Sequence, residues 1–587
     1  MRLLVLLAVS MVSVGAALPA QLPKPPAANG LIVGIVVDAD TGKPVSGAIV
    51  SVSSPAPASP FPREAPAALP RILTGTDGRF VYRNLPRGNY SITVTRSGYA
   101  AGAYGRRRPA GPSVQLDLAD GERTADVVLR IWKHAAISGT VVDEAGEAVV
   151  GARVRSWRRA FDGGRYAFMP ASAGVTDDRG IYRIGGLVPG DYVVGVPATQ
   201  VAGGELPAEE RSSAISPTSS APSAFVRTAP VPPPPVDGRL WLYPSTWHPS
   251  ARSSAQASMV TAQSGQERGG IDLQMHPVST ARVSGTVTRA EGPVSGVPVR
   301  MVPVGDETIE DAGFVTGVDG NGSFIFPAVP AGPYVLRVAA TLSTGEKQMM
   351  MTTLWAETAL TVGESDVEDV AMEIGRGIRI HGRLEFDGTK PGPARVDRVP
   401  LLVEPVDRRL TFPPGSVTVD AGQFSSGGYP PGRYFVRVSG SPIGWMFKSA
   451  TYGGRDVSET PIELVSEDVH VVLTYTDRWT GLVGTVNAAD GRPDTDAIVL
   501  VFPADPKLWV NYGTSPRRLK SARTRKSGEF SFNSLPPGSY HVVALPDEQA
   551  ADWVDPAFLE AVSRIATQIT IGDGEQKTAN LRTRVLR

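Results

Sequence analysis

The sequence predicts an all-β protein of five tandem Greek-key β-sandwich domains, of prealbumin or immunoglobulin-like type. A motif of two glycines and two aromatic residues occurs five times along the 587 residues. Apolar residues alternate with polar ones next to each copy, which is typical of half-buried strands. The 63 glycines and 52 prolines make up about a fifth of the chain, against a usual share near 12%. This excess favours many turns, and therefore many short strands.

The repeated motif has the same spacing in every copy. Its glycines are ten residues apart, an aromatic residue stands two positions after the first glycine, and a tyrosine stands two positions after the second. The copies are Gly78, Phe80, Gly88 and Tyr90; Gly180, Tyr182, Gly190 and Tyr192; Gly322, Phe324, Gly332 and Tyr334; Gly422, Phe424, Gly432 and Tyr434; and Gly528, Phe530, Gly538 and Tyr540.

Each part of the motif has a physical reading. The first glycine suits a tight turn, because it accepts a positive φ without steric cost. The proline before the second glycine ends the strand, because it cannot donate to a ladder. A new strand then begins at the tyrosine. A tyrosine at such a corner buries its ring and reaches a backbone partner with its hydroxyl group.

An upstream half precedes the motif and completes each domain. In copy one it contains Gly34 to Asp38, then a Gly/Pro turn and a second strand from Ala48 to Val52. Copy four keeps only His381 to Leu384 of this half and is degenerate. We place the domains at 31–130, 137–275, 283–375, 379–475 and 481–587. A Pro/Ser-rich insertion at about 198–240 explains the length of the second domain.

One segment departs from the strand pattern. Phe558, Leu559, Val562 and Ile565 are spaced as on one face of a helix. Asp555 suits the N-cap and Pro556 the first helical position. We expect a short helix over 556–567 that packs on the fifth domain.

The N-terminus is typical of an export signal. Arg2 precedes the apolar run from Leu3 to Val14, and small residues follow, so we expect a signal peptide over 1–20. No second apolar stretch is long enough for a transmembrane helix after cleavage. The chain has no cysteine, so its stability must come from the cores alone. We expect a periplasmic or extracellular protein.

The charge balance argues against nucleic acid as a partner. The 58 basic and 58 acidic residues cancel, whereas phosphate binding needs a basic surplus. The most obvious basic run is Arg106 to Arg108, for which we expect a solvated loop.

The upstream half and the motif together resemble the carboxypeptidase regulatory-like domain. Copies one, two, three and five carry the resemblance well, and copy four departs from it. The resemblance implies a transthyretin-like sandwich of the carbohydrate-binding-like folds, usually an accessory domain without catalytic residues. Such a fold does not by itself fix a function.

The residues themselves give little sign of catalysis, so we expect no enzyme and no cofactor. The six histidines are dispersed, and no His-x-x-Glu, nucleophile elbow or phosphate-binding loop occurs. Asp38 to Gly42 superficially resembles a calcium loop, but turn chemistry accounts for it without a metal.

Four aromatic residues are candidates for ligand binding: Trp157, Trp241, Tyr243 and Trp247. Exposed on loops, they would form a platform for a glycan. We favour the alternative that they fill the core or clamp the insertion. Trp445, Trp509 and Trp553 are expected to pack in or beside domains four and five.

Two classes of function remain. The first is an exported, non-catalytic binding or adhesion rod, with a glycan as one candidate ligand. The second is a structural spacer or assembly protein that binds an envelope protein. Exposed aromatic residues on one loop cluster favour the first class, and stiff contacts between domains favour the second.

Overall fold

A computed structural model of the chain describes residues 29–53, 69–109, 111–198, 239–290, 292–306, 309, 313–343, 351–406 and 415–586. The expected signal peptide (1–20) lies outside these residues, as does nearly all of the insertion expected at about 198–240. The described chain is all-β, as predicted, and contains a separate buried hydrophobic cluster in each of the five repeats.

The first three repeats contain the following elements. Repeat one comprises β1 (Gly30–Asp38), β2 (Ile49–Ser53), β3 (Ile72–Leu73), β4 (Arg79–Leu85), β5 (Gly88–Arg96), β6 (Tyr99–Ala103), β7 (Leu116–Leu118) and β8 (Arg123–Lys133). Repeat two comprises β9 (Ala135–Val142), β10 (Arg153–Asp162), β11 (Arg165–Val175), β12 (Ile181–Leu187), β13 (Gly190–Val196), β15 (Thr246–Trp247), η1 (Ser254–Gln256), β16 (Val260–Ala262), β17 (Glu267–Arg268) and β18 (Leu273–Gln274). Repeat three comprises β14 (Trp241–Leu242), β19 (Val278–Arg289), β20 (Gly292–Pro293), β21 (Pro298–Pro303), β22 (Phe314–Gly317), β23 (Ser323–Pro330), β24 (Gly332–Ser343), β25 (Met351–Val362), β26 (Val367–Glu373) and β27 (Gly375–Arg376).

The last two repeats follow without a long connection. Repeat four comprises β28 (Ile378–Asp387), β29 (Arg398–Pro405), β30 (Gly415–Asp420), β31 (Gln423–Tyr429), β32 (Gly432–Val438), β33 (Met446–Tyr452), β34 (Arg455–Asp456), β35 (Ile462–Leu464) and β36 (Val469–Thr476). Repeat five comprises β37 (Gly481–Asn487), β38 (Ala497–Pro503), η2 (Pro506–Trp509), β39 (Lys520–Arg523), β40 (Glu529–Asn533), β41 (Gly538–Pro546), η3 (Asp547–Ala550), α2 (Pro556–Ser563), β42 (Thr567–Ile571), β43 (Gln576–Thr578) and β44 (Leu581–Arg582).

All five repeats share one topology. The first strand of each repeat pairs antiparallel with the strand that follows the motif turn, and parallel with the last strands of the repeat. The second strand pairs with a hairpin partner on one side and with the tyrosine strand on the other. Repeat four keeps this arrangement, although its upstream half is degenerate in sequence.

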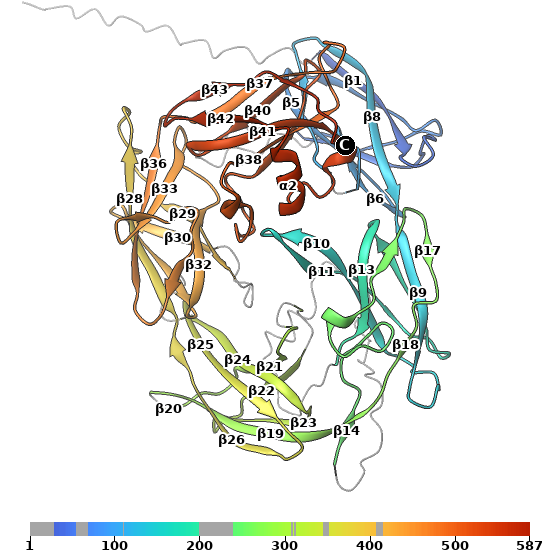
Figure 1. The fold of residues 1–587 in the computed structure, drawn as a ribbon, viewed down its shortest axis with the longest axis vertical. Helices are drawn as coiled ribbons and strands as arrows, with labels where there is room; N and C mark the ends of the chain where they lie inside the picture. The colour runs from blue at the N-terminus through green and yellow to red at the C-terminus, as the bar shows by residue number, and fades with distance from the viewer. Residues whose placement is uncertain are drawn as a thin grey trace, which may run out of the picture.

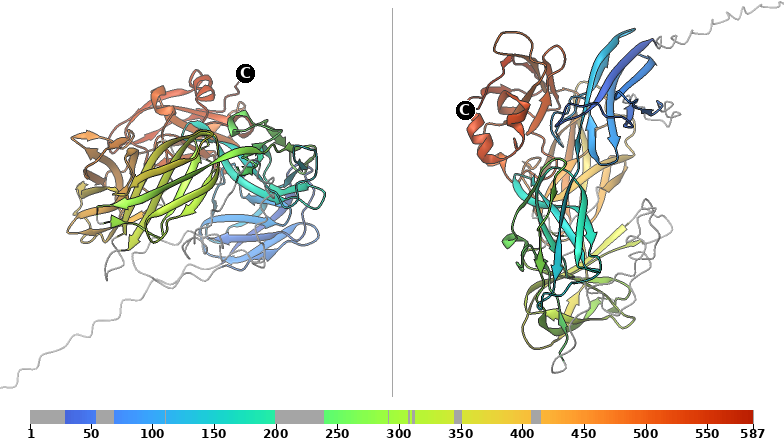
Figure 2. Two further views of the ribbon diagram at one scale, coloured as in Figure 1. Left: turned by 90° about the horizontal axis from the view of Figure 1, so that it is seen from below. Right: turned by 90° about the vertical axis from the view of Figure 1, so that its right-hand side faces the viewer.

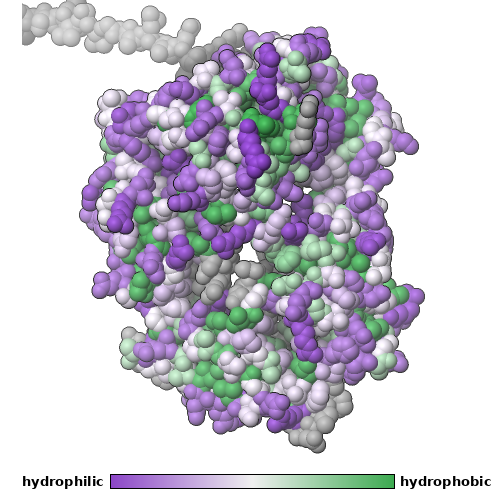
Figure 3. Space-filling view, in the orientation of Figure 1, coloured by the Kyte–Doolittle hydropathy of each residue, from purple (hydrophilic) through white to green (hydrophobic). Residues whose placement is uncertain are grey.

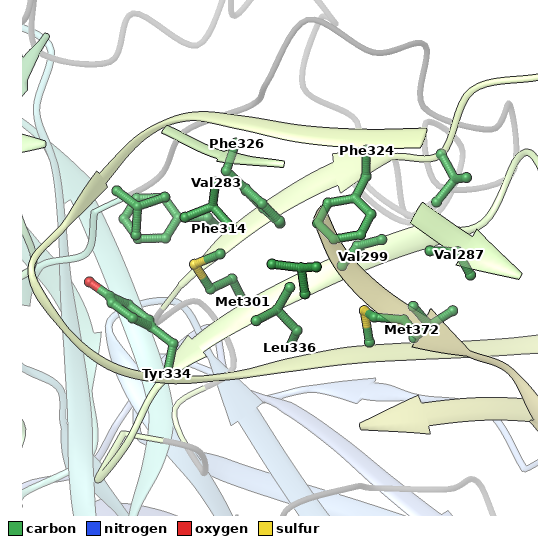
Figure 4. Close-up of a cluster of buried hydrophobic side chains, with 14 of the residues drawn as sticks. Val283, Val287, Val299, Met301, Phe314, Phe324, Phe326, Tyr334, Leu336 and Met372 are labelled. Carbon is green, nitrogen blue, oxygen red and sulfur yellow. The ribbon is translucent and has the colours of Figure 1, made fainter. Parts of the chain in front are cut away.

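The motif tyrosines form the same corner in every repeat. Their side chains are at most 5% exposed, and each hydroxyl group donates to the carbonyl oxygen four residues earlier. In repeat three the Oη of Tyr334 lies 3.0 Å from the carbonyl oxygen of Pro330. Figure 4 shows this ring at the edge of the cluster that contains Met301, Phe324 and Leu336. Burial of the ring and pairing of the hydroxyl group together stabilise the corner.

A glycine in the first strand makes room for the motif aromatic residue. At Gly34, an added Cβ atom would overlap the ring of Phe80 and the carbonyl oxygen of Val127. Gly285 and Gly382 face Phe324 and Phe424 in the same way. The upstream half and the motif therefore pack directly against each other.

The short helix of repeat five begins where the sequence predicts but ends earlier. The carboxylate of Asp555 accepts a hydrogen bond from the backbone N of Ala557 at 2.8 Å, and α2 then runs from Pro556 to Ser563. Leu559 and Val562 are fully buried against Trp509 and Tyr512. Thr567 belongs to β42 instead of the helix.

The five repeats form a closed ring, so the expected rod is wrong. In Figure 1 the five repeats follow one another around a circle, and repeat five returns to lie beside repeats one and two. The side view in Figure 2 shows how repeats one and five adjoin at one end of the molecule. The space-filling view in Figure 3 is hollowed between the repeats, and its surface is mainly hydrophilic with scattered apolar patches.

Part of the predicted second domain belongs to repeat three. Trp241 and Leu242 form β14, which pairs with β19 of repeat three. Leu242 and Ala198 are buried in the core of that repeat. The end of the insertion therefore ties repeats two and three together.

Within the described part of the chain, no helix is long and apolar enough to cross a membrane.

Candidate functional site

Two of the four predicted binding residues are buried in a cluster between repeats two and three. Trp157 is 0% and Trp247 1% exposed, and their ring centroids lie 4.6 Å apart. Val193 and Ile309, the latter from a loop of repeat three, complete the cluster. These tryptophans do not offer a surface platform, which agrees with the packing alternative in the sequence analysis.

The other two predicted residues are half-buried and do not form a pair. Trp241 lies in β14, while Tyr243 packs against the core of repeat two. The hydroxyl group of Tyr243 donates to the Oε2 atom of Glu144 at 3.0 Å. Burial, followed by this hydrogen bond, raises the pKa of Tyr243 to about 12. The structure therefore does not bring the four residues together as one site.

A different tryptophan is exposed. All nine tryptophans lie within the described residues. Trp479 is 42% exposed, whereas the other eight are buried or half-buried. Trp445 and Trp509 are buried and Trp553 is half-buried, as expected from the sequence. An exposed tryptophan is unusual because its large apolar surface is normally removed from water.

Trp479 lies at one end of the repeat-four sandwich. Thr476, the last residue of β36, pairs with Asp387 at the end of β28 and with Met446 at the start of β33. Three connections therefore leave the sandwich at this end: residues 388–397, 439–445 and 477–480. Ile443, in the second of them, is 61% exposed. We call these three connections the loop end of repeat four.

Four charged side chains, one of them Arg478 next to Trp479 in the chain, form a network of alternating charge. The Nζ atom of Lys448 lies 2.5 Å from the Oδ2 atom of Asp387 and 3.1 Å from that of Asp573 in repeat five. The Nη2 atom of Arg478 lies 2.7 Å and 3.3 Å from the same two oxygens. The hydrogen bond from Lys448 lowers the pKa of Asp387, and the same bond raises the pKa of Lys448. Both shifts favour the charged forms of Asp387 and Lys448.

Asp477 fixes the first loop against the segment that carries Trp479. Its Oδ2 atom accepts hydrogen bonds from the backbone N atoms of Thr389 at 3.0 Å and Lys390 at 2.9 Å. The bond from Lys390, foremost, lowers the pKa of Asp477. The loop end is thus held by defined contacts, which positions an exposed side chain at low entropic cost.

Trp479 is not among the binding residues predicted from the sequence. The residue follows the last strand of repeat four and precedes Gly481, so it falls between the domains predicted at 379–475 and 481–587. The available signal was a tryptophan in the polar stretch from Asp477 to Thr480, outside any alternating pattern. Exposure itself depends on how two repeats meet and has no local signature.

No arrangement typical of a catalytic metal centre occurs in the described residues. Among them, no group of three or more His, Cys, Asp or Glu side chains could hold a metal ion. In the calcium-like loop, the Oδ1 atom of Asp38 accepts hydrogen bonds from the backbone N atoms of Asp40 and Thr41. The Oδ2 atom of Asp38 lies 3.6 Å from the Nζ atom of Lys133. Turn hydrogen bonds and a lysine thus account for this carboxylate.

Comparison with protein families gives one match, to the first repeat. Residues 32–130 match the model of the carboxypeptidase regulatory-like domain, in agreement with the resemblance seen in the sequence. A comparison with curated proteins finds no match.

Several solved structures are similar to this chain at low sequence identity. The Bacillus anthracis TIE protein is 10% identical, with 92% of this chain and 69% of that chain covered and a TM-score of 0.14. GBS52, the minor pilin of Streptococcus agalactiae, is 13% identical, covers 42% of this chain and 96% of its own, and has a TM-score of 0.21. Two B repeat units of the collagen binding protein of Staphylococcus aureus are 10% identical, with 76% and 99% covered and a TM-score of 0.12. TM-scores this low do not indicate a shared function.

Proposed function

We propose that this chain is an exported, non-catalytic binding protein that recognises a glycan at the loop end of repeat four. The observation that carries the proposal is the exposure of Trp479, at 42%, when each of the other eight tryptophans is buried or half-buried. It lies on a connection between strands, where binding residues are commonly found on a rigid scaffold.

The chemistry of the neighbouring side chains suits a sugar. A sugar ring has an apolar C–H face, which can stack on an indole ring, and hydroxyl groups at its edge. Arg478, the chain neighbour of Trp479, and Lys448 carry donors, and Asp387 and Asp573, with which they pair, carry acceptors. A flat apolar contact with a few convergent polar groups is the usual pattern of a small-ligand site.

The closed ring disfavours the spacer alternative. A spacer separates its two ends, whereas here repeat five contacts repeat one directly. A protein partner is the remaining competitor, because tryptophan and arginine are also enriched in protein-binding hot spots.

The test is binding of the mature chain to a panel of polysaccharides and peptidoglycan, compared with the Trp479→Ala variant. We expect saturable binding that Trp479→Ala reduces at least about tenfold, a loss of about 1.4 kcal/mol. Trp241→Ala is the matched control, since this half-buried tryptophan lies in another repeat, and it should bind like the unmodified chain. Binding that is equal in all three proteins would place the site elsewhere. Absence of binding to every glycan would leave a protein partner as the explanation for Trp479.

A further inference from the structure

The five repeats of the ring meet at five junctions, which we call seams. At four of them the two repeats are consecutive in the chain. Between repeats one and two, β8 is followed after one residue by β9. Repeats two and three share the β14–β19 pairing. Repeats three and four meet where the backbone N of Gly377 donates to the carbonyl oxygen of Thr353 at 2.8 Å. Repeats four and five are linked through Asp477 to Thr480. The seam that closes the ring joins repeats that are not consecutive in the chain.

The closing seam is formed on one side by the arginine run of repeat one. Arg107 forms an ion pair with Asp496 of repeat five. The Nη2 atom of Arg108 donates to the carbonyl oxygen of Ala550 at 2.7 Å, and its Nε atom lies 3.7 Å from the Oδ2 atom of Asp547. The expectation of a solvated loop at Arg106 to Arg108 is therefore wrong, because Arg107 and Arg108 dock on repeat five.

The β10–β11 hairpin of repeat two forms the other side of the closing seam. Its turn approaches repeat five so closely that a Cβ atom added to Gly164 would overlap the carbonyl oxygen of Trp509 and the Cα atom of Val510. Next to it, the hydroxyl group of Tyr166 donates to the Oδ2 atom of Asp555 at 3.4 Å. Tyr166 is still 48% exposed, so this contact covers little apolar surface.

In one part of this seam, three arginine side chains share two carboxylates. Asp496 and Asp547 are already engaged by Arg523 of repeat five, whose Nη1 atom lies 2.8 Å from the Oδ1 atom of Asp547. Arg107 and Arg108 add two further cations to the same two carboxylates. Burial, foremost, lowers the pKa of Arg523, and the proximity of Arg107 and Arg108 contributes. The docked state therefore combines attraction with repulsion among like charges.

The carboxylate of Asp547, which faces Arg108, is 5% exposed, whereas another ion pair across the seam is exposed on both sides. Arg525 of repeat five and Asp117 of repeat one lie 3.4 Å apart, and each side chain is 47% exposed. None of the hydrophobic clusters of the described residues combines side chains of repeat five with those of repeat one or two. Interactions between exposed charges are weakened by salt, whereas buried apolar contacts are not.

From these contacts we propose that the closing seam is a salt-sensitive clasp. Repeat five separates reversibly from repeats one and two as ionic strength rises, while all five sandwiches stay folded. The motion changes the ring into an open arc, with the other four seams intact. This inference does not depend on the glycan proposal, since the clasp and the loop end of repeat four are different parts of the molecule.

The absence of cysteine from the chain permits a direct test. Asp120 in repeat one and Glu548 in repeat five are exposed and take part in none of the seam contacts described above. An Asp120→Cys/Glu548→Cys protein is labelled with a donor and an acceptor dye, and energy transfer is followed from about 0.05 M to about 1 M salt. Far-ultraviolet circular dichroism is recorded on the same samples. We expect energy transfer to fall as salt rises, with an unchanged circular dichroism spectrum, and to recover on dilution.

Two sets of substitutions identify the seam responsible. Arg107→Ala/Arg108→Ala should show at low salt the reduced transfer that the unmodified ring shows only at high salt. Arg282→Ala/Arg564→Ala removes the same charge from ion pairs inside repeats three and five, with Glu368 and Glu560, and should leave transfer unchanged. The proposal is overturned if the unmodified chain keeps full transfer at high salt, or if the clasp variant keeps full transfer at low salt. A fall in transfer that coincides with loss of circular dichroism would also overturn it, because the repeats would then be unfolding.

Discussion

Repeat two meets its neighbours through two seams of opposite chemistry. Toward repeat three it buries Trp157 and Trp247 against Ile309 and shares a strand pairing. Toward repeat five it offers a hairpin turn and the exposed Tyr166. Burial of apolar area persists under most solution conditions, whereas exposed polar contacts depend on salt. One seam therefore joins repeats two and three into a single unit, while we expect the other to break without unfolding of the repeats.

The largest effect is expected at the apolar seam. Trp247→Ala removes a fully buried indole ring and should lower the free energy of unfolding by about 3–5 kcal/mol. Denaturant unfolding measures the change, with Trp479→Ala as the control, which should stay within about 0.5 kcal/mol. Equal stability of the two variants would contradict the burial of Trp247.

Substitution of a motif tyrosine tests whether truncation inside a repeat core lowers the free energy of unfolding as much as truncation at this seam. Tyr334→Ala should destabilise repeat three by about 3–5 kcal/mol, because the ring is buried. Tyr334→Phe keeps the ring and loses only the hydrogen bond to Pro330, so it should cost about 0.5–1.5 kcal/mol. Melting curves of the two variants are the measurement, and an unchanged curve for Tyr334→Ala refutes the corner.

A substitution at the seam between repeats four and five should have an intermediate effect on the free energy of unfolding. Arg437, 2% exposed, donates to the carbonyl oxygens of Tyr512 and Ser515, and Glu404 accepts from the backbone N of Thr514 at 2.8 Å. Glu404→Gln removes the charge that faces Arg437 and should cost about 1–3 kcal/mol in chemical unfolding. Glu463→Gln, a carboxylate in β35 of the same repeat, is the control. A cost as small as that of the control would mean that the buried charge is not needed there.

Loss of the exposed ion pair of the closing seam should have the smallest effect of these substitutions on the free energy of unfolding. Arg525→Ala removes one ion pair with Asp117 and should change the free energy of unfolding by about 0–1 kcal/mol at low salt. The difference should vanish near 1 M salt, where the Debye length is about 3 Å. A cost that persists at high salt would indicate that this seam is not electrostatic.

Acid should weaken the network at the loop end of repeat four. The pKa of Asp387 is lowered from its ordinary 3.8 in the folded chain, mainly by the hydrogen bond from Lys448. Its stabilising contribution is therefore present above 3.8 and is lost as the pH falls through the lowered value. Comparison of the unmodified chain with Asp387→Asn in acid titrations checks this. The two stabilities should converge at low pH, and a constant difference would contradict the lowered pKa.

The sequence was sufficient for features made by neighbouring residues. The tyrosine corner joins residues four apart, and the turn before it joins residues even closer, so a repeated local pattern contains the whole contact. The N-cap of α2 is local in the same way. These elements, and with them the five sandwiches, follow from spacing and periodicity.

The ring and the exposed tryptophan could not be predicted in this way. Arg107 and Asp496 are 389 residues apart, so no local pattern relates them. The hairpins that form several seams lie between the upstream half and the motif, where the repeats differ in sequence. Whether Trp479 is exposed likewise depends on how repeats four and five meet, which no local pattern records.

Closure of the ring has a consequence for the number of repeats. In an open array each unit contacts only its neighbours, so units can be gained or lost one at a time. Here the last unit must also reach Arg107 and Gly164 near the start of the chain. A chain with four or six such units would turn through a different total angle and would miss that contact. The closing contact is therefore compatible with five repeats and not with a smaller or larger number.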